Sequence, residues 1–577
     1  MFRENHVRSW LTASVSALAG AAALSVYLQW DWNITYWPLA MLLVLSVYFG
    51  HLWFVNPKRK ERRIGLAFGM LFVFLQICGR RLTVAETLAV KTSDFIWLAA
   101  ASMGLSPAAG GMFAALTGLI AGRRALTPTL ERRKSMLVLI GCTALFLLCW
   151  LPYLLAFYPG LFTYDISWQY EQYQTWKLNT HHPLLHTLLV GWFCDLGWHL
   201  FGYPAKGILM YTVFQMTLMA LAMASAVRLL YRHRAPLWCC AAVTALNALM
   251  PFHALLVISS TKDTLFSGAV LYLVITLLEL FLEKDALHRL GWIVRFLIAL
   301  VLVGLLRNNG FVCMAAVLAA ALVCIVRWKK AAVKLAALTM AGIVLYSSAN
   351  TLLISATDAE KGHFREMLSV PLQQMARVYA LTDDTAKAEI KEWLPTVELY
   401  SPHLADLVKN TFEAEKEQLP QLFRLWLEVG LRHPVVYVDS LLVTSAGFYD
   451  ISAEPTGDYL ETRFHTDEGK WIVDGSKWPE LRAKTANLYS NNAFLDIPLY
   501  NLLLSPALWV WIMLFAAAAG WCVENRAVVF AAMAPIALYL TTLLSPCVMT
   551  RYLYPFMLCA PVLASVLFIG QKTEENQ

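Results

Sequence analysis

The feature that most restricts the fold is a series of apolar runs, of which 137–156 and 335–354 are two examples. A helical run of roughly 17 to 25 apolar residues crosses a hydrocarbon layer about 30 Å thick. A closed barrel would instead show short segments of alternating residues, because lipid does not tolerate unpaired backbone. The chain is therefore predicted to be an all-α polytopic membrane protein.

Composition agrees with this class. Charged residues make up 15% of the chain and mean hydropathy is +0.55, whereas globular domains carry about 25% charged residues. The eleven cysteines are scattered without a CxxC pair, which supports neither a zinc site nor a disulfide framework. Arg3 and Arg8 precede small apolar residues, as in a secretory signal. The apolar run continues toward Leu28, so a retained first helix is expected.

Basic loops set the expected orientation. The segments 56–63, 131–135, 228–234 and 327–330 are rich in Lys and Arg, which are retained in the cytoplasm. About fourteen transmembrane helices, with both termini inside, place all four segments there. The expected spans are 10–29, 37–55, 64–79, 94–121, 137–158, 206–230, 237–257, 264–282, 291–306, 310–327, 335–354, 501–523, 527–545 and 551–570.

Two segments conflict with this map. Arg80 and Arg81 fall outside the cytoplasm. The apolar segment 183–201 is long enough for another span, which would reverse every later loop. We interpret it as a helix lying in or dipping into the outer interface, where Trp192 and Trp198 are favourable. A short re-entrant pair would fit as well.

The expected domains are 1–136, 137–354 with an outward loop at 159–205, 355–500, and 501–577. Residues 355–500 hold 14 Lys and Arg against 23 Asp and Glu, a net charge of −9, whereas the remainder carries +16. This asymmetry predicts one extracytoplasmic domain. Apolar spacing over 419–444 predicts that it is mainly helical, and 451–475 is expected to be loop with short strands.

The outward loop carries the first candidate site residues. An ionisable group at a helix centre in a membrane costs roughly 2.5 to 3.5 kcal/mol, so such groups mark candidate functional sites. Asp165 is a candidate general base, or else a helix cap. His182 and His186 have i, i+4 spacing that could present two imidazoles to one metal or phosphate. They could instead mark a helix entry at Pro183.

Further charges lie on the other outward turns. Lys262 and Asp263 form either an ion pair at a turn or part of an anion site. Arg307, next to Asn308, and Arg551 offer guanidinium groups suited to phosphate, or they anchor their helices at the interface. Together these residues predict a site for a phosphorylated, lipid-linked molecule.

Several motifs are missing. The sequence contains no GxxxxGK[ST] loop, no GxGxxG after a strand and no GxSxG elbow. Nucleic-acid binding is not expected, because the basic residues lie in loops that flank the membrane.

"YPGLFTYDISWQYEQ", "HHPLLH", "TKDTLF", "RNNG" and "RYLYP" resemble patterns in GT-C-type integral membrane glycosyltransferases, including uncharacterised bacterial families. The resemblance covers roughly 137–320 and 545–570. It implies transfer of a sugar from a polyprenyl-phosphate donor to an extracytoplasmic glycan, lipid or protein, with inversion at the anomeric carbon.

By this resemblance, Asp165 would be the catalytic base and His182 would shape the same loop. Lys262, Arg307 and Arg551 would bind the donor phosphate, with Asn308 beside them as a further substrate-binding residue. Asp263 would orient Lys262 or join Asp165 around a divalent cation. Some members of the group use a metal such as Mg²⁺ or Mn²⁺ and others do not, and Ser167 replaces the second acid of a DxD motif here.

Three other functions stay open. A transporter or flippase of lipid-linked glycans would be expected to show inverted repeats around a midplane site. A polysaccharide polymerase also combines many spans with one large external loop. A noncatalytic scaffold would not need the outward carboxylates and cations.

Overall fold

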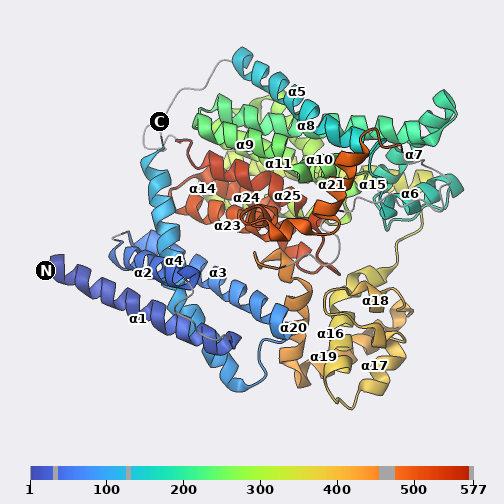
Figure 1. The fold of residues 1–577 in the computed structure, drawn as a ribbon. Helices are drawn as coiled ribbons and strands as arrows, with labels where there is room; N and C mark the ends of the chain where they lie inside the picture. Colours follow the sequence, from blue (N-terminus) through green and yellow to red (C-terminus); the bar gives the residue numbers. More distant parts are fainter. Residues whose placement is uncertain are drawn as a thin grey trace.

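The computed structural model describes residues 2–29, 37–56, 58–124, 132–453, 460 and 475–570. Regular structure in these residues is helical, and extended pairing is limited to isolated bridges. The expected all-α fold is confirmed for this part of the chain. Figure 1 shows three groups: α1 to α4, a large central bundle, and a smaller helical unit.

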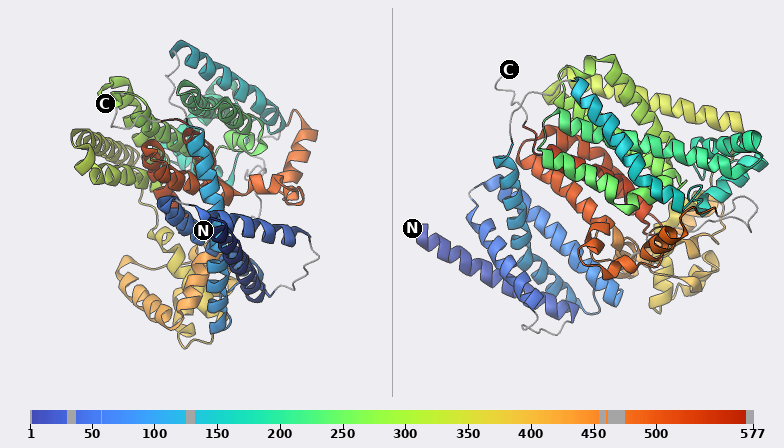
Figure 2. Two further views of the ribbon diagram at one scale, coloured as in Figure 1. Left: turned by 90° about the vertical axis from the view of Figure 1, so that its left-hand side faces the viewer. Right: turned by 45° about the horizontal axis from the view of Figure 1, so that its top comes forward.

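The first group packs through small residues. Its helices are α1 (Phe2–Leu28), α2 (Trp37–Val55), α3 (Arg59–Ala85) and α4 (Thr92–Gly122). Both views in Figure 2 show them together at one side of the bundle. A Cβ on Gly20 of α1 would lie 2.8 Å from the carbonyl carbon of Gly104 on α4. Such close approach lets helices associate in lipid, where no hydrophobic force drives them together.

Gly104→Ala is expected to separate α1 from α4 and to lower the thermal midpoint of the detergent-solubilised protein, because the new methyl group meets the backbone of Gly20. Gly118→Ala on the same helix is the control, since a Cβ there meets nothing within 4 Å. Alanine also favours a helix by roughly 1 kcal/mol over glycine. Heating followed by size-exclusion chromatography gives both midpoints, and equal values would contradict this account of the contact.

The central bundle surrounds α11 (Lys262–Leu282), and most residues of this helix are buried. This helix contacts α8, α12, α24 and α25. The other bundle helices are α5 (Arg132–Ala156), α8 (Pro204–Arg232), α9 (Leu237–Leu249), α10 (Pro251–Ile258), α12 (Leu290–Leu306), α13 (Phe311–Val323), α14 (Ile325–Trp328), α15 (Lys330–Thr357), α23 (Pro506–Cys522), α24 (Arg526–Thr542) and α25 (Thr550–Val566). At one end of the bundle lie α6 (Tyr164–Thr175) and α7 (Leu184–Phe201).

Helical structure covers most of each expected span, although 237–257, 310–327 and 501–523 each divide into two helices. The number of membrane spans remains a prediction. Eight described helices are long and apolar enough to cross a membrane, or nine if a bent pair counts as one span. The eight are α1, α3, α4, α5, α7, α8, α11 and α15. The helices α12, α13, α23, α24 and α25 have 13 to 17 residues. They are only about 20–25 Å long at 1.5 Å per residue.

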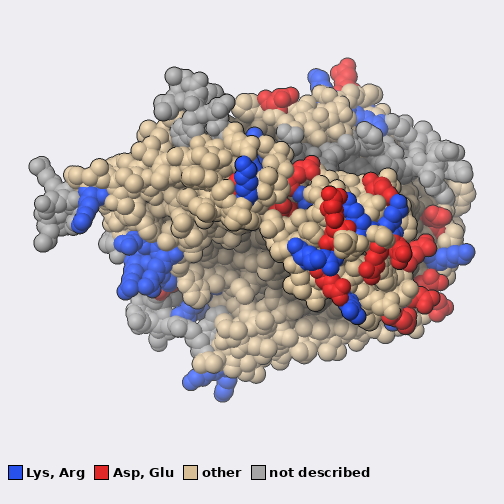
Figure 3. Space-filling model, turned by 90° about the horizontal axis from the view of Figure 1, so that it is seen from below, with Lys and Arg blue, Asp and Glu red and all other residues tan. Residues whose placement is uncertain are grey.

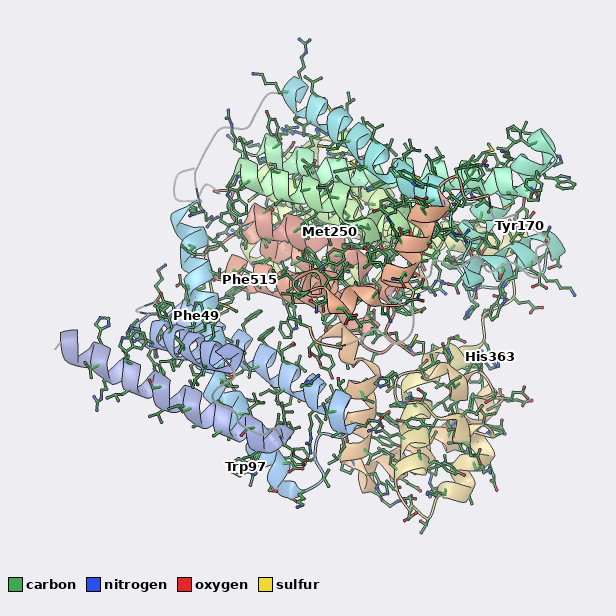
Figure 4. All side chains as sticks on the ribbon, in the orientation of Figure 1. Phe49, Trp97, Tyr170, Met250, His363 and Phe515 are labelled. Atoms are coloured by element: carbon green, nitrogen blue, oxygen red, sulfur yellow. The ribbon has the colours of Figure 1, made fainter. Side chains whose placement is uncertain are left out.

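The expected continuous helix over 237–257 is wrong. The chain forms α9 and α10, which are bent by 56° at Met250 and Pro251. Proline has no backbone N–H to continue the helix and its ring disfavours a helical residue before it. Figure 4 marks Met250 at this break.

The third group is the helical unit that follows α15, and it has its own apolar core. Its helices are α16 (Ser369–Leu381), α17 (Lys387–Trp393), α18 (Asp406–Lys409), α19 (Leu419–Arg432) and α20 (Pro434–Thr444). The helical prediction for 419–444 is confirmed. Figure 3 shows acidic side chains gathered over this unit, and Figure 4 marks His363 where the chain enters it. Most of 451–475, where short strands were expected, lies outside the described residues.

This unit is tied to two segments that carry candidate site residues. Asn179 pairs with Glu360 in a parallel bridge, just before the histidines of the α6–α7 loop. Leu404 pairs with Cys547 in an antiparallel bridge, just before the start of α25. The unit therefore adjoins the site described next. The helices α21 (Pro479–Tyr489) and α22 (Tyr500–Leu504) lead back to the bundle.

Candidate functional site

The segments that precede α6 and α11 lie side by side and are paired through their backbones. Leu161 pairs with Ser259 in a parallel bridge. Four residues beyond each partner, Asp165 lies in the first turn of α6 and Asp263 in the first turn of α11. The backbone pairing therefore sets the two carboxylates side by side.

Five charged side chains form one continuous cluster. Asp165 Oδ2 lies 3.0 Å from Lys262 Nζ and 3.1 Å from Arg551 Nη1. Arg551 Nε lies 3.5 Å from Asp263 Oδ2, and Arg307 Nη1 lies 2.9 Å from Asp263 Oδ1. The side chains are largely buried, from 1% exposed for Asp263 to 16% for Lys262. The structure thus brings together two carboxylates and three cations that the sequence places in four separate segments.

Neighbouring groups hold the edge of the cluster. The Arg307 guanidinium carbon lies 4.7 Å from the centroid of the Tyr552 ring, a cation–π contact. Asn308 Nδ2 donates to the carbonyls of Thr180 at 3.1 Å and His181 at 3.3 Å. Asn308 therefore braces the loop that leads to α7 and contributes no ion pair.

His182 and His186 do not converge on one site, and of the two interpretations of their spacing the structure shows the helix entry, because Pro183 directly precedes α7. Lys262 Nζ donates to His182 Nδ1 at 3.1 Å. His186 instead bonds Gln169 and Tyr211, each at 2.8 Å. The reason is that α7 begins after His182, so helical i, i+4 geometry does not apply to the pair.

The donor set does not fit a divalent cation. Within the described ranges, no group of three or more His, Cys, Asp or Glu side chains is placed to hold a metal ion. Mg²⁺ and Mn²⁺ take oxygen ligands. Asp165 and Asp263 are already paired with cations, and a metal would lie beside three positive side chains. We therefore assign no metal ligand.

Burial and charge fix the protonation states. Burial raises the pKa of Asp165, but Lys262 and then Arg551 outweigh it and hold this pKa well below its usual range. Burial, followed by Lys262, lowers the pKa of His182 to about 2, so its imidazole is neutral near pH 7. With three cations and two carboxylates, the cluster carries a surplus of one positive charge. Such a surplus suits a single anionic group.

Comparison with known proteins gives a family but no activity. Residues 174–577 match the family described as "Family of unknown function (DUF6020)". The chain belongs to this family. The DUF6020 match contains four of the five charged residues of the cluster, from Lys262 to Arg551, and begins after Asp165. No curated protein and no solved structure matches the chain.

The DUF6020 region also contains a buried polar network that sequence reasoning missed. Tyr211 donates to Gln215 Oε1 at 2.9 Å, and Gln215 Nε2 donates to the Ser259 carbonyl at 2.7 Å. Through His186, this network links α6 to the turn that precedes Lys262. The available signal was Gln215, an amide in the middle of an apolar span, because a buried amide needs hydrogen-bond partners.

Proposed function

We propose that this protein is an inverting membrane glycosyltransferase that moves a sugar from a polyprenyl-phosphate donor to an extracytoplasmic acceptor. The observation that carries the proposal is the buried cluster in which three cations surround two carboxylates. Cations can stabilise a leaving phosphate, and a carboxylate can take a proton. The resemblance of the loops to GT-C-type glycosyltransferases supports the same reaction.

In the proposed reaction, Asp165 accepts the proton of an acceptor hydroxyl while that oxygen attacks the anomeric carbon. The bond from the anomeric carbon to the phosphate oxygen breaks, and the lipid phosphate leaves with the bonding electron pair. Lys262, Arg307 and Arg551 stabilise the charge that develops on this phosphate. Asp263 keeps the two guanidinium groups in place. Attack opposite the leaving phosphate inverts the anomeric configuration.

Asp165 is a weak base while two cations contact it. A donor phosphate offers Lys262 and Arg551 a second anionic partner. As these cations turn to the phosphate, the proton affinity of Asp165 rises, because nearby positive charge is what lowers its pKa. Donor binding is therefore expected to precede proton abstraction from the acceptor.

The basic loops support an outward-facing site. The helices α8 and α11 run from the cluster to the opposite end of the bundle, where Arg232 Nη2 lies 3.1 Å from Glu283 Oε1. That end carries the basic segment 228–234, and basic segments are retained in the cytoplasm. Nucleotide sugars are cytoplasmic, so an outward-facing site needs a donor already carried across the bilayer on a lipid.

We place α7 along the outer membrane surface. Its length and composition would allow it to cross the membrane. However, His186 and Gly197, eleven residues apart on α7, contact Tyr211 and Gly207, which are only four apart on α8. Such contacts fit a helix that crosses the start of α8 obliquely. The exposed tryptophans of α7 suit the interface.

The proposal is tested with purified protein in lipid vesicles that contain a radiolabelled polyprenyl-phosphate sugar and an envelope-derived acceptor. We expect a new glycosidic bond to the acceptor. Label that crosses the bilayer without a new bond would contradict the proposal and support a flippase. Mass spectrometry of envelope glycans from cells with and without the gene would then identify the acceptor.

A further inference from the structure

Three buried polar atoms beside the charged cluster have no hydrogen-bond partner among the described residues. They are Thr163 Oγ1, Thr261 Oγ1 and His182 Nε2. Their residues are only 1%, 2% and 3% exposed, respectively. Burying a polar group without a partner costs free energy, so three of them around one cluster call for an explanation.

The two threonines occupy equivalent places. Each lies two residues beyond the bridge between Leu161 and Ser259, and each precedes a helix: Thr163 before α6 and Thr261 before α11. Threonine at this position usually accepts a hydrogen bond from the first turn of its helix. Neither side chain does so here. Both hydroxyls therefore remain available beside two helix N-termini, whose positive dipole ends attract anions.

The histidine adds a donor of known tautomer. A lysine ammonium can only donate, so His182 Nδ1, which lies 3.1 Å from Lys262 Nζ, must accept. A neutral imidazole then carries its proton on Nε2. His182 Nε2 is therefore a buried donor that lacks an acceptor.

We propose that Thr163, Thr261 and His182 bind the phosphoryl group of the substrate through Oγ1–H, Oγ1–H and Nε2–H. The identity of this substrate as the lipid-linked donor rests on the proposed function. Lys262, Arg307 and Arg551 supply positive charge for the anionic phosphoryl group. The three neutral donors orient this group through hydrogen bonds. The sequence signal is the repeated Thr-x-Asp, in which the threonine binds the anion and the aspartate organises the cations.

Thr163→Val and Thr261→Val test this assignment, because valine keeps the shape and removes the hydroxyl. Binding of farnesyl phosphate and of inorganic phosphate to the detergent-solubilised full chain is measured by calorimetry. Each variant is expected to bind both probes about 10-fold or more weakly, since hydrogen bonds to charged groups are the strong ones. The thermal midpoint of the free protein should stay the same or rise, because each variant removes an unpartnered polar atom.

Thr276→Val is the matched control on α11, since Thr276 is buried and its hydroxyl already donates to the Leu273 carbonyl at 2.7 Å. It should bind both probes as the wild type does. Wild-type affinity in Thr163→Val and Thr261→Val, with or without a lower midpoint, would overturn the assignment. A loss for farnesyl phosphate alone would place the hydroxyls against the lipid and would also overturn it.

The histidine is tested by comparing two variants. His182→Gln keeps an acceptor for Lys262 and a donor in place of Nε2–H, so it should retain most of the phosphate affinity. His182→Leu should lose it. Equal affinities for the two would remove His182 from the site. All of these measurements are independent of sugar transfer: a wild-type protein that binds phosphate but transfers no sugar would contradict the proposed function alone.

Discussion

Asp165→Asn is expected to abolish sugar transfer while the protein still binds its lipid-linked donor. An amide cannot accept the proton of the acceptor hydroxyl, and general-base catalysis typically contributes about 10²–10⁴-fold to a rate. Donor affinity should stay the same or rise, because Lys262 and Arg551 lose the carboxylate that competes with the phosphate. Transfer from a radiolabelled donor and equilibrium binding of the same donor are the two measurements.

Asp195→Asn is the control for this result. Asp195 accepts a hydrogen bond from the Tyr173 hydroxyl at 2.9 Å and lies on α7, away from the ion pairs. Its variant should transfer sugar at close to the wild-type rate. A wild-type rate in Asp165→Asn would show that this carboxylate is not the base.

Arg551→Met is expected to produce the largest loss of stability among single changes in the cluster. Arg551 contacts both Asp165 and Asp263, which are 8% and 1% exposed. Breaking a buried ion pair typically costs about 3–5 kcal/mol, and this change removes one cationic partner from each of the two carboxylates. The thermal midpoint in detergent should therefore fall clearly, and sugar transfer should be lost.

Two further variants show whether the fall in the thermal midpoint is specific to Arg551 or follows from removing any arginine. Arg551→Lys keeps the charge but cannot reach both carboxylates with a planar fork, so its midpoint should lie between those of the wild type and Arg551→Met. Arg424→Met removes an exposed arginine that pairs with Glu428, and exposed pairs contribute little. Equal midpoints for Arg551→Met and Arg424→Met would mean that the cluster does not hold the helices together.

The sequence was most informative about features whose alternatives cost much free energy, namely unpaired backbone in lipid and buried charges without partners. Apolar runs must become helices in lipid, and helical structure covers most of each expected span, although three of the spans divide into two helices. Lys262, Arg307 and Arg551 are identifiable from the sequence because positive charge is unusual on loops expected to face outward. Their convergence on Asp165 and Asp263 follows from the need of buried charges for partners.

Other features depend on contacts between distant segments, which no local pattern encodes. The pairing of Leu161 with Ser259 brings Asp165 to Asp263, although nearly a hundred residues separate them. The separate roles of His182 and His186 depend on where α7 begins. The bend at Pro251 was readable from the sequence, but the apolar run on both sides of it favoured one continuous span.

A structure with a non-hydrolysable phosphonate analogue of the donor tests the central claim most directly, because that claim is a shared site for the phosphate and the base. We expect phosphonate oxygens within hydrogen-bond distance of Lys262 Nζ and the Arg551 guanidinium, with the anomeric carbon facing Asp165. An analogue bound elsewhere, with Lys262 and Arg551 still on Asp165 as in the free protein, would contradict the account.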